Sequence, residues 1–383
     1  MSDEKITSKD VHRPSMSDET VGNLKTMAAA SRTAQDVRNS DEQQKRDEAW
    51  QYYAGYGEYY QQRRAEQAKT AKVDVVKFGG DKVTLIASIN INKDTGEAIS
   101  GHDYDPESQS MKDIESAWQD FLATTQPEER LVVFEGSKVS ADEIPNRDIA
   151  IRNRTESGLV QYLAAQARVE TTGGEPTNME VADQLEQQGV PRLETALLFT
   201  IRSLSMHHSE QPIGDIKFHF LPQMRWLGYE GFEDYSQVEK DSFKQDGNGN
   251  FVDNSPEAEA IRVRIDSDVL SKVEPFTSDW NKMLTRYGLP QLEVANGGLS
   301  FEHAISQDEL ADKADPAKDG ELSHMFARIV AIRDRHIFDV IADATRKGKK
   351  VFAPYGGSHE VSLEPVLQDY FGSMESSLQI QTR

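Results

Sequence analysis

The chain of 383 residues contains no cysteine. This excludes disulfide bonds, thiolate nucleophiles and zinc sites built on thiolates. The chain also has no run of about 18 apolar residues, the length that lets a helix span a bilayer, so we expect no transmembrane segment. Its beginning, Met1-Ser2-Asp3-Glu4-Lys5, lacks the apolar stretch of a signal peptide. We therefore expect a cytoplasmic protein.

Positive charge is scarce relative to negative charge, and the formal net charge is −22. Because an acidic chain repels nucleic acid and anionic membrane surfaces, we expect neither as a partner. Two common catalytic signatures are missing as well. The sequence has neither the Gly-x-Ser-x-Gly of serine hydrolases nor a phosphate-binding loop. The composition leaves a small-molecule or peptide substrate as the expected partner.

Composition divides the chain into three parts. Residues 1–40 are polar, with few large apolar side chains, and are predicted to form a disordered tail. Residues 41–70 combine helix-forming residues with several tyrosines and are predicted to form a helical, Tyr-rich arm. Residues 71–383 are predicted to form a single α/β domain, with an irregular insertion at about 209–300 where no period persists.

The aromatic residues of the arm allow two interpretations. Several follow helical spacing, and the cluster consists of Trp50, Tyr52, Tyr53, Tyr56, Tyr59 and Tyr60. Exposed aromatics can bind a partner or a single nucleic-acid strand. Alternatively, the helix packs these rings on its own domain. The arm lacks the basic charge that nucleic-acid binding requires, which favours packing.

Short apolar runs bounded by turn residues predict buried strands. Two of them, residues 73–78 and 82–89, are joined by Gly79-Gly80-Asp81 and predict a hairpin. The clearest buried strand covers residues 130–136, and a last one begins near Lys349. Helical patterns cover residues 110–124, 157–167, 179–188, 191–206 and 323–346. This alternation predicts an α/β fold with a central, mainly parallel sheet, flanking helices and a helical insertion.

Polar side chains lie where predicted strands or tight loops end. Asn90, Glu135, Glu175 and His359 occupy such positions, and Arg333 lies on the helix before the last strand. The carboxyl ends of parallel strands meet at one sheet edge, where α/β folds place their sites. An acid pair, a histidine and a cation are the components of general acid–base catalysis or metal-assisted hydrolysis.

His359 follows the run Gly356-Gly357-Ser358, which predicts a sharp turn rather than a place in the core. Loop residues on a rigid sheet carry function more often than core packing. We therefore expect removal of the imidazole to abolish binding or turnover, while the free energy of unfolding changes by no more than about 1 kcal/mol.

Four short motifs resemble the TraB/Tiki and erythromycin-esterase/ChaN-like superfamily. Gly356-Gly357-Ser358-His359 is similar to its second Gly-x-x-His motif, and Val133-Phe134-Glu135-Gly136 to its strand-ending glutamate. Gly174-Glu175-Pro176 is similar to its central Gly-Glu-Pro loop, and Arg333-Asp334 to its Arg-Asp helix motif. The motifs occur in the order of the family. The resemblance implies a hydrolase with a His/Glu site at the sheet edge.

The resemblance also implies roles for single residues. Glu135, Glu175, His359 and Arg333 correspond to catalytic positions. A divalent metal is implied at His359, Glu135 and Asn90.

The first Gly-x-x-His motif of the family is altered here. The corresponding stretch is Ala87-Ser88-Ile89-Asn90, with asparagine in the histidine position. A neutral amide is a poorer ligand for transition metals than imidazole. His102, in a following loop, is an alternative ligand. The change supports a second hypothesis, a non-catalytic member of the fold that binds a ligand or partner in the same cleft.

Overall fold

The computed structural model describes most of the chain. The described residues are 34–70, 73–88, 90–91, 98–99, 105–136, 138, 140, 143–205, 212–244, 251–372 and 374–376. The chain divides into two compact units, Met1–Gln51 and Tyr52–Arg383. No helix in these described ranges is both long and apolar enough to cross a membrane.

The described part of the smaller unit is one helix, α2 (Ala34–Trp50). It begins before residue 40, the predicted end of the disordered tail, while residues 1–33 lie outside the described part. The predicted arm consists of two helices, because α3 (Glu58–Thr70) starts after a break and belongs to the larger unit. Gly55 lies in that break with a φ of +52°, a left-handed conformation that favours glycine.

Helices and strands alternate along the larger unit. In chain order it contains α3, β1 (Asp74–Phe78), β2 (Val83–Ser88), β3 (Asn90–Ile91), β4 (Ala98–Ile99), α4 (Gln109–Thr124), β5 (Arg130–Phe134), α5 (Arg147–Ala167), β6 (Glu170–Gly173), α6 (Asn178–Gln187), α7 (Arg192–Ser205), α8 (Lys217–Trp226), α9 (Gln237–Asp241), α10 (Pro256–Val273), α11 (Thr277–Arg286), β7 (Leu292–Ala295), β8 (Gly298–Phe301), α12 (Gln307–Ala314), α13 (Glu321–Arg346), β9 (Lys350–Gly356), α14 (Gly357–Phe371) and β10 (Met374–Ser376).

The central sheet is mixed but mainly parallel, as predicted. Its strand order is β10-β1-β2-β9-β5-β6, and β2, β9, β5 and β6 run parallel. The predicted hairpin is confirmed, since β1 pairs antiparallel with β2 and Val76 lies opposite Leu85. The strand β6 was not predicted. It is defined by its backbone pairing with β5, for example Val132 with Thr171.

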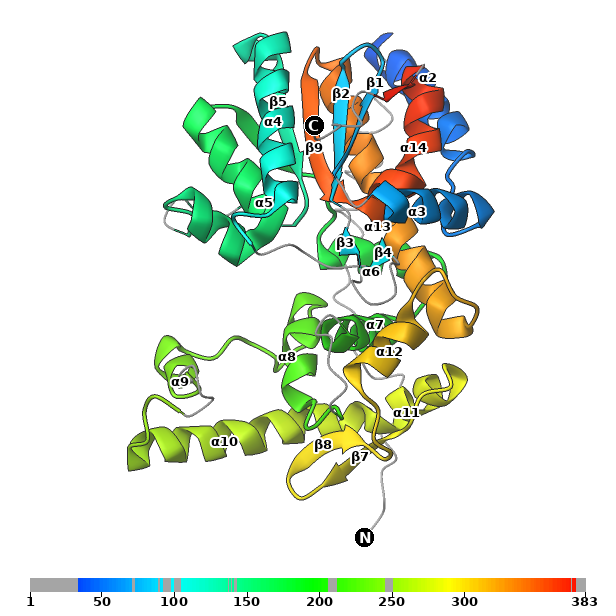
Figure 1. Cartoon of the computed structure of the whole chain (residues 1–383). Helices are drawn as coiled ribbons and strands as arrows, with labels where there is room; N and C mark the ends of the chain where they lie inside the picture. The colour runs from blue at the N-terminus through cyan, green and yellow to red at the C-terminus, as the bar shows by residue number, and fades with distance from the viewer. Residues whose placement is uncertain are drawn as a thin grey trace. The chain divides into compact units, whose positions relative to one another are not determined.

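Helices cover both faces of the sheet (Figure 1). On one face, α4 and α5 pack over alternate strand residues such as Val132 and Phe352. The ring of Trp118 on α4 meets that of Phe352 edge to face, with centroids 5.2 Å apart. On the other face, α13 and α14 contact β9, and α14 also contacts β1 and β2. The central strands are therefore buried on both sides, which explains their nearly continuous apolar sequence.

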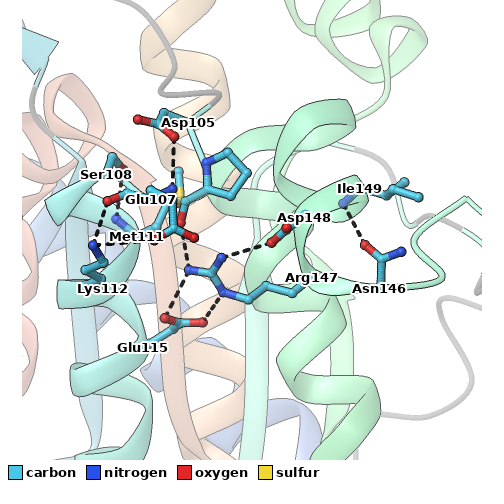
Figure 2. Close-up of polar contacts among 11 residues, drawn as sticks. Asp105, Glu107, Ser108, Met111, Lys112, Glu115, Asn146, Arg147, Asp148 and Ile149 are labelled. Carbon is cyan, nitrogen blue, oxygen red and sulfur yellow. Dashed lines mark hydrogen bonds and ion pairs between the residues drawn. The ribbon is translucent and has the colours of Figure 1, made fainter.

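An arginine at the start of α5 ties this helix to α4 (Figure 2). The guanidinium of Arg147 donates two hydrogen bonds to the carboxylate of Glu115 on α4, at 2.6 and 3.2 Å. It also donates to the backbone carbonyl of Pro106 at 2.9 Å. The bond to Glu115 raises the pKa of Arg147. This bidentate pair fixes the position of the first turn of α5 relative to α4.

The insertion was predicted as irregular, but its helices and hairpin share a hydrophobic core with the helices that flank it. Helices α6, α7, α8, α11 and α12 and the hairpin β7–β8 surround rings such as Phe220 and Trp280, which stack with centroids 4.0 Å apart. Apart from α10, with 18 residues, the helices of the insertion have at most 10 residues, so no sequence period extends far. The first half of α13, including Ile329, packs into this core.

Candidate functional site

Three neighbouring parallel strands deliver the predicted acids and histidine to one place. β9, β5 and β6 lie side by side in the sheet and point the same way. Glu135 directly follows β5, Glu175 comes two residues after β6, and His359 lies in the first turn of α14, just after β9. The carboxyl edge of the sheet therefore brings together residues that are far apart in the sequence.

The three side chains form a compact cluster. One ligand atom each of Glu135, Glu175 and His359 lies within 4.8 Å of the others. Oε1 of Glu135 is 4.0 Å from Nε2 of His359. Arg333 of α13 joins them, because its Nη2 donates to Oε1 of Glu175 and lies 3.6 Å from Oε1 of Glu135. The structure thus brings the four predicted site residues together, while their roles remain predictions.

A close backbone approach fixes the position of Glu175. Gly174 donates its N–H to the carbonyl of Phe134 at 3.0 Å, and the hydroxyl of Tyr355 donates to the same carbonyl at 3.3 Å. A Cβ atom on Gly174 would lie 1.8 Å from the Tyr355 oxygen and 2.7 Å from a methyl carbon of Val133. No other residue type fits there without movement, so the glycine sets where Glu175 leaves the sheet.

The end of β5 is held from the side by α5. This helix has a kink at Thr155, where φ is +55° and ψ is −139°. Directly after the kink, the hydroxyl of Ser157 donates to the carbonyl of Glu135 at 2.7 Å. The sequence predicted only the part of the helix beyond the kink. Together with Gly136, at φ +80°, this contact positions Glu135.

His359 is more buried than the glycine run predicted. It lies in helix α14 rather than in a loop, and only 5% of its surface is exposed. The prediction was wrong because Gly356 acts as the N-cap of α14, so the glycines start a helix directly at the strand end. Nδ1 of His359 contacts Oδ1 of Asp334, and Nε2 faces Glu135.

Asp334 is the buried anchor behind the histidine. Its carboxylate is 0% exposed. Oδ2 accepts hydrogen bonds from the hydroxyls of Ser362 and Tyr53, each at 2.6 Å. Because an ionised carboxylate only accepts, Nδ1 of His359 is the donor in this contact. In the neutral imidazole the lone pair then lies on Nε2, which faces the cluster. A carboxylate behind the ring is the usual support for a metal-binding histidine.

Sequence reasoning did not assign roles to Asp334, Ser362 or Tyr53. Asp334 stood beside Arg333 in the quoted helix motif, which was a usable signal. Tyr53 belongs to the aromatic cluster of the arm, and the structure packs part of that cluster on its own domain. Burial, followed by the charge of Asp334, raises the pKa of Tyr53, so its hydroxyl remains a donor. Tyr60 is buried as well, whereas Tyr52 is exposed.

Asn90 and His102 remain untested as ligands. The backbone of Asn90 forms β3, just after β2, and Ser88 of β2 pairs with Gly356 at the end of β9. The side chain of Asn90 and the whole of His102 lie outside the described residues.

Comparisons of the chain with protein-family models, curated proteins and solved structures give no match. The likeness to the TraB/Tiki and erythromycin-esterase/ChaN-like superfamily therefore rests on the motifs alone. Independently of it, Glu135, Glu175 and His359 could hold a metal ion. Their donors, one imidazole nitrogen and two carboxylates, suit a divalent transition metal.

Proposed function

We propose that the chain is a metal-dependent hydrolase of the TraB/Tiki or erythromycin-esterase type, acting on a small-molecule or peptide substrate. One observation carries the proposal: an imidazole and two carboxylates converge within 4.8 Å at the carboxyl edge of a mainly parallel sheet. A buried carboxylate behind the imidazole supports it.

The cluster fits a divalent metal held by Glu135, Glu175 and His359. Such an ion would act as a Lewis acid and lower the pKa of bound water. Asp334 keeps the proton on Nδ1 of His359, so that Nε2 is the ligating atom. Arg333 holds Glu175 in place through its ion pair.

Glu135 is the carboxylate best placed to move a proton. Its side chain is 23% exposed, against 16% for Glu175, so it is the more accessible of the two acids. It lies between Arg333 and His359, at 3.6 and 4.0 Å. One oxygen of Glu135 is counted as a metal ligand, and we assign the other oxygen the role of accepting a proton from the attacking water and returning it to the leaving group.

A second candidate is binding without catalysis. Arg333 already pairs with Glu175 and approaches Glu135, an arrangement that a purely structural ion-pair network would also show. In that case the cleft would bind a ligand or partner and would neither take up metal nor turn over a substrate.

Metal content and turnover separate the two candidates. Protein purified without chelator is analysed for bound metals, titrated with Zn²⁺ and Mn²⁺, and assayed on model esters and peptides. The exposed Glu230 provides a matched control, because Glu230→Gln makes the same chemical change as Glu175→Gln outside the cluster. We expect Glu175→Gln and Glu135→Gln to lose metal or turnover while Glu230→Gln keeps both. Wild-type protein that binds no divalent metal and hydrolyses none of the model compounds would refute the hydrolase.

A further inference from the structure

The loop before α3 reaches the two residues that support His359 from behind. The hydroxyl of Tyr53 donates to Oδ2 of Asp334 at 2.6 Å, and the backbone N–H of Ala54 donates to the carbonyl of Ser362 at 3.4 Å. The hydroxyl of Ser362 donates to the same Oδ2. A loop that contains none of the proposed metal ligands therefore fixes the carboxylate that contacts Nδ1 of His359.

Helix α3, into which this loop leads, packs on α14 (Figure 1). Of the side chains at residues 58–67 of this helix, only Tyr60 and Gln67 are buried. A helix of 13 residues is only marginally stable in water on its own. So few buried side chains contribute little hydrophobic stabilisation. The position of α3 on α14 therefore depends on polar contacts.

Arg63 links α3 to both α14 and β1. Its Nε donates to Oε2 of Glu364 at 3.1 Å, and its Nη2 donates to Oδ2 of Asp74 at 2.8 Å. Nη2 also lies 3.8 Å from Oε1 of Glu360. The side chain of Glu364 is 5% exposed and that of Glu360 is fully buried. Removing the cation would leave these buried carboxylates uncompensated, which costs more than the loss of an exposed ion pair. Without Arg63, α3 should therefore separate from α14, so that the carboxylates regain water.

Gln67 adds a second contact on the same face of α3. Its amide nitrogen donates to Oε2 of Glu360, and its amide oxygen accepts from Nη1 of Arg64 at 2.8 Å, which fixes the orientation of the amide. Gln67 follows Arg63 by four residues on α3, just as Glu364 follows Glu360 by four residues on α14. Residues with this spacing share one face of a helix. One face of α3 thus meets one face of α14.

These contacts and the support of the metal site share the beginning of α14. His359 contacts Asp334, whereas the next residue, Glu360, faces α3. Because Tyr53 lies in the loop before α3, displacement of this helix would withdraw the Tyr53 hydroxyl from Asp334. Water would then reach a carboxylate that is 0% exposed in the structure. A solvated carboxylate holds the imidazole less firmly, since water screens their interaction.

We propose that Arg63 is a positioning residue of the metal site. By docking α3 on α14 it keeps Tyr53 on Asp334, so the orientation of His359 and its affinity for a divalent metal depend on a helix that contains no ligand. The part that concerns metal rests on the proposed function, whereas the positioning of His359 can be tested without metal.

The first measurement is hydrogen exchange of the Nδ1 proton of His359 in the metal-free full chain. The proton is followed by NMR and assigned by its absence from His359→Gln. A buried proton exchanges with water when the structure over it opens locally. Arg63→Gln should speed this exchange about tenfold or more, because it leaves buried carboxylates without their cation. Arg63→Lys keeps the charge but loses the planar fork, so its rate should lie between those of Arg63→Gln and wild type.

The second measurement is calorimetric titration with Zn²⁺. Arg63→Gln should bind Zn²⁺ about five- to tenfold more weakly, less than the effect of about 10- to 100-fold expected for a direct partner of a ligating histidine. Because Tyr53 transmits the effect, the double variant Arg63→Gln/Tyr53→Phe should bind no more weakly than Arg63→Gln alone. The control is Arg264→Gln in α10, which makes the same chemical change and removes an ion pair with Glu239 of α9. It should match wild type in both measurements.

Three results would overturn the role of Arg63. The first is wild-type exchange and Zn²⁺ affinity in Arg63→Gln, even if urea unfolds this variant more easily, since Arg63 would then serve the fold alone. The second is full additivity of the losses in the double variant. The third is an Nδ1 proton that exchanges in wild type as fast as that of free imidazole, because α3 would then not protect the site.

If Arg63→Gln does not fold, Gln67→Ala replaces it and should change exchange and affinity in the same direction by a smaller factor. Metal uptake separates this proposal from the hydrolase. Protein that takes up no metal, yet exchanges the Nδ1 proton faster in Arg63→Gln, would retain the positioning of His359 by Arg63 and refute the metal-dependent function.

Discussion

Replacing Asp334 by asparagine tests the whole arrangement behind the histidine. The change keeps the shape of the side chain but leaves one acceptor oxygen and one amide donor. If the oxygen keeps the hydrogen bonds from Tyr53 and Ser362, the amide group faces Nδ1 of His359. Nδ1 must then accept a hydrogen bond, so the ring proton moves to Nε2. The nitrogen that faces Glu135 would lose its free lone pair.

Two magnitudes follow from this change of tautomer. The affinity for Zn²⁺ should fall about 10- to 100-fold, as for other residues that support a metal-binding histidine. The free energy of unfolding should fall by about 1 kcal/mol, the difference between hydrogen bonds to a charged group and neutral hydrogen bonds. Titration calorimetry and urea denaturation measure the two effects separately.

The control is Asp319→Asn, an exposed aspartate before α13, which should change neither quantity. A variant of Asp334 that unfolds more easily but binds Zn²⁺ like wild type would show that this aspartate only supports the fold. Unchanged stability would refute the buried hydrogen-bond network itself.

Four further predictions follow from single contacts. Tyr53→Phe should lower Zn²⁺ affinity less than the Asp334 variant, because Ser362 still donates to the same oxygen; equal losses in calorimetry would contradict this. His359→Ala should cost about 1–3 kcal/mol in urea denaturation, since it leaves a buried carboxylate oxygen without its partner; the glycine run alone had predicted less. Gly174→Ala should cost about 1–3 kcal/mol in the same assay through overpacking, and an unchanged midpoint would contradict the clash. Burial raises the pKa of Glu360 above its ordinary value, so the folded state binds this proton more tightly than the unfolded chain. The free energy of unfolding therefore falls as pH rises through the raised pKa. In Glu360→Gln, urea denaturation at a series of pH values should show a free energy of unfolding that depends less on pH than in wild type.

The sequence predicted which residues meet at the edge of the sheet, but it did not predict the hydrogen bonds that support His359 from behind. Glu135, Glu175 and His359 could be placed together because each follows a strand, and parallel strands end at the same edge. The contact between Tyr53 and Asp334 joins residues 281 positions apart. It depends on how the arm packs on α14, and no local pattern encodes that packing.

Local patterns also failed where structure depends on neighbours. The short strand β6 has few apolar residues and is defined by its backbone bonds to β5. Most elements of the insertion are too short to show a period, and they share their core with the flanking helices α6, α7, α12 and α13.

Helix α13 belongs to two cores at once. Ile329 in its first half packs in the insertion, and Phe338 in its second half meets Tyr370 of α14 at 5.2 Å. Arg333 and Asp334 lie between these halves, on a rod of 26 residues. Because α13 is one continuous helix, a shift of its first half also moves its second half. A packing defect in the insertion, such as Trp280→Ala, should therefore loosen the cluster at a distance, and loss of metal affinity on heating should coincide with a single unfolding transition.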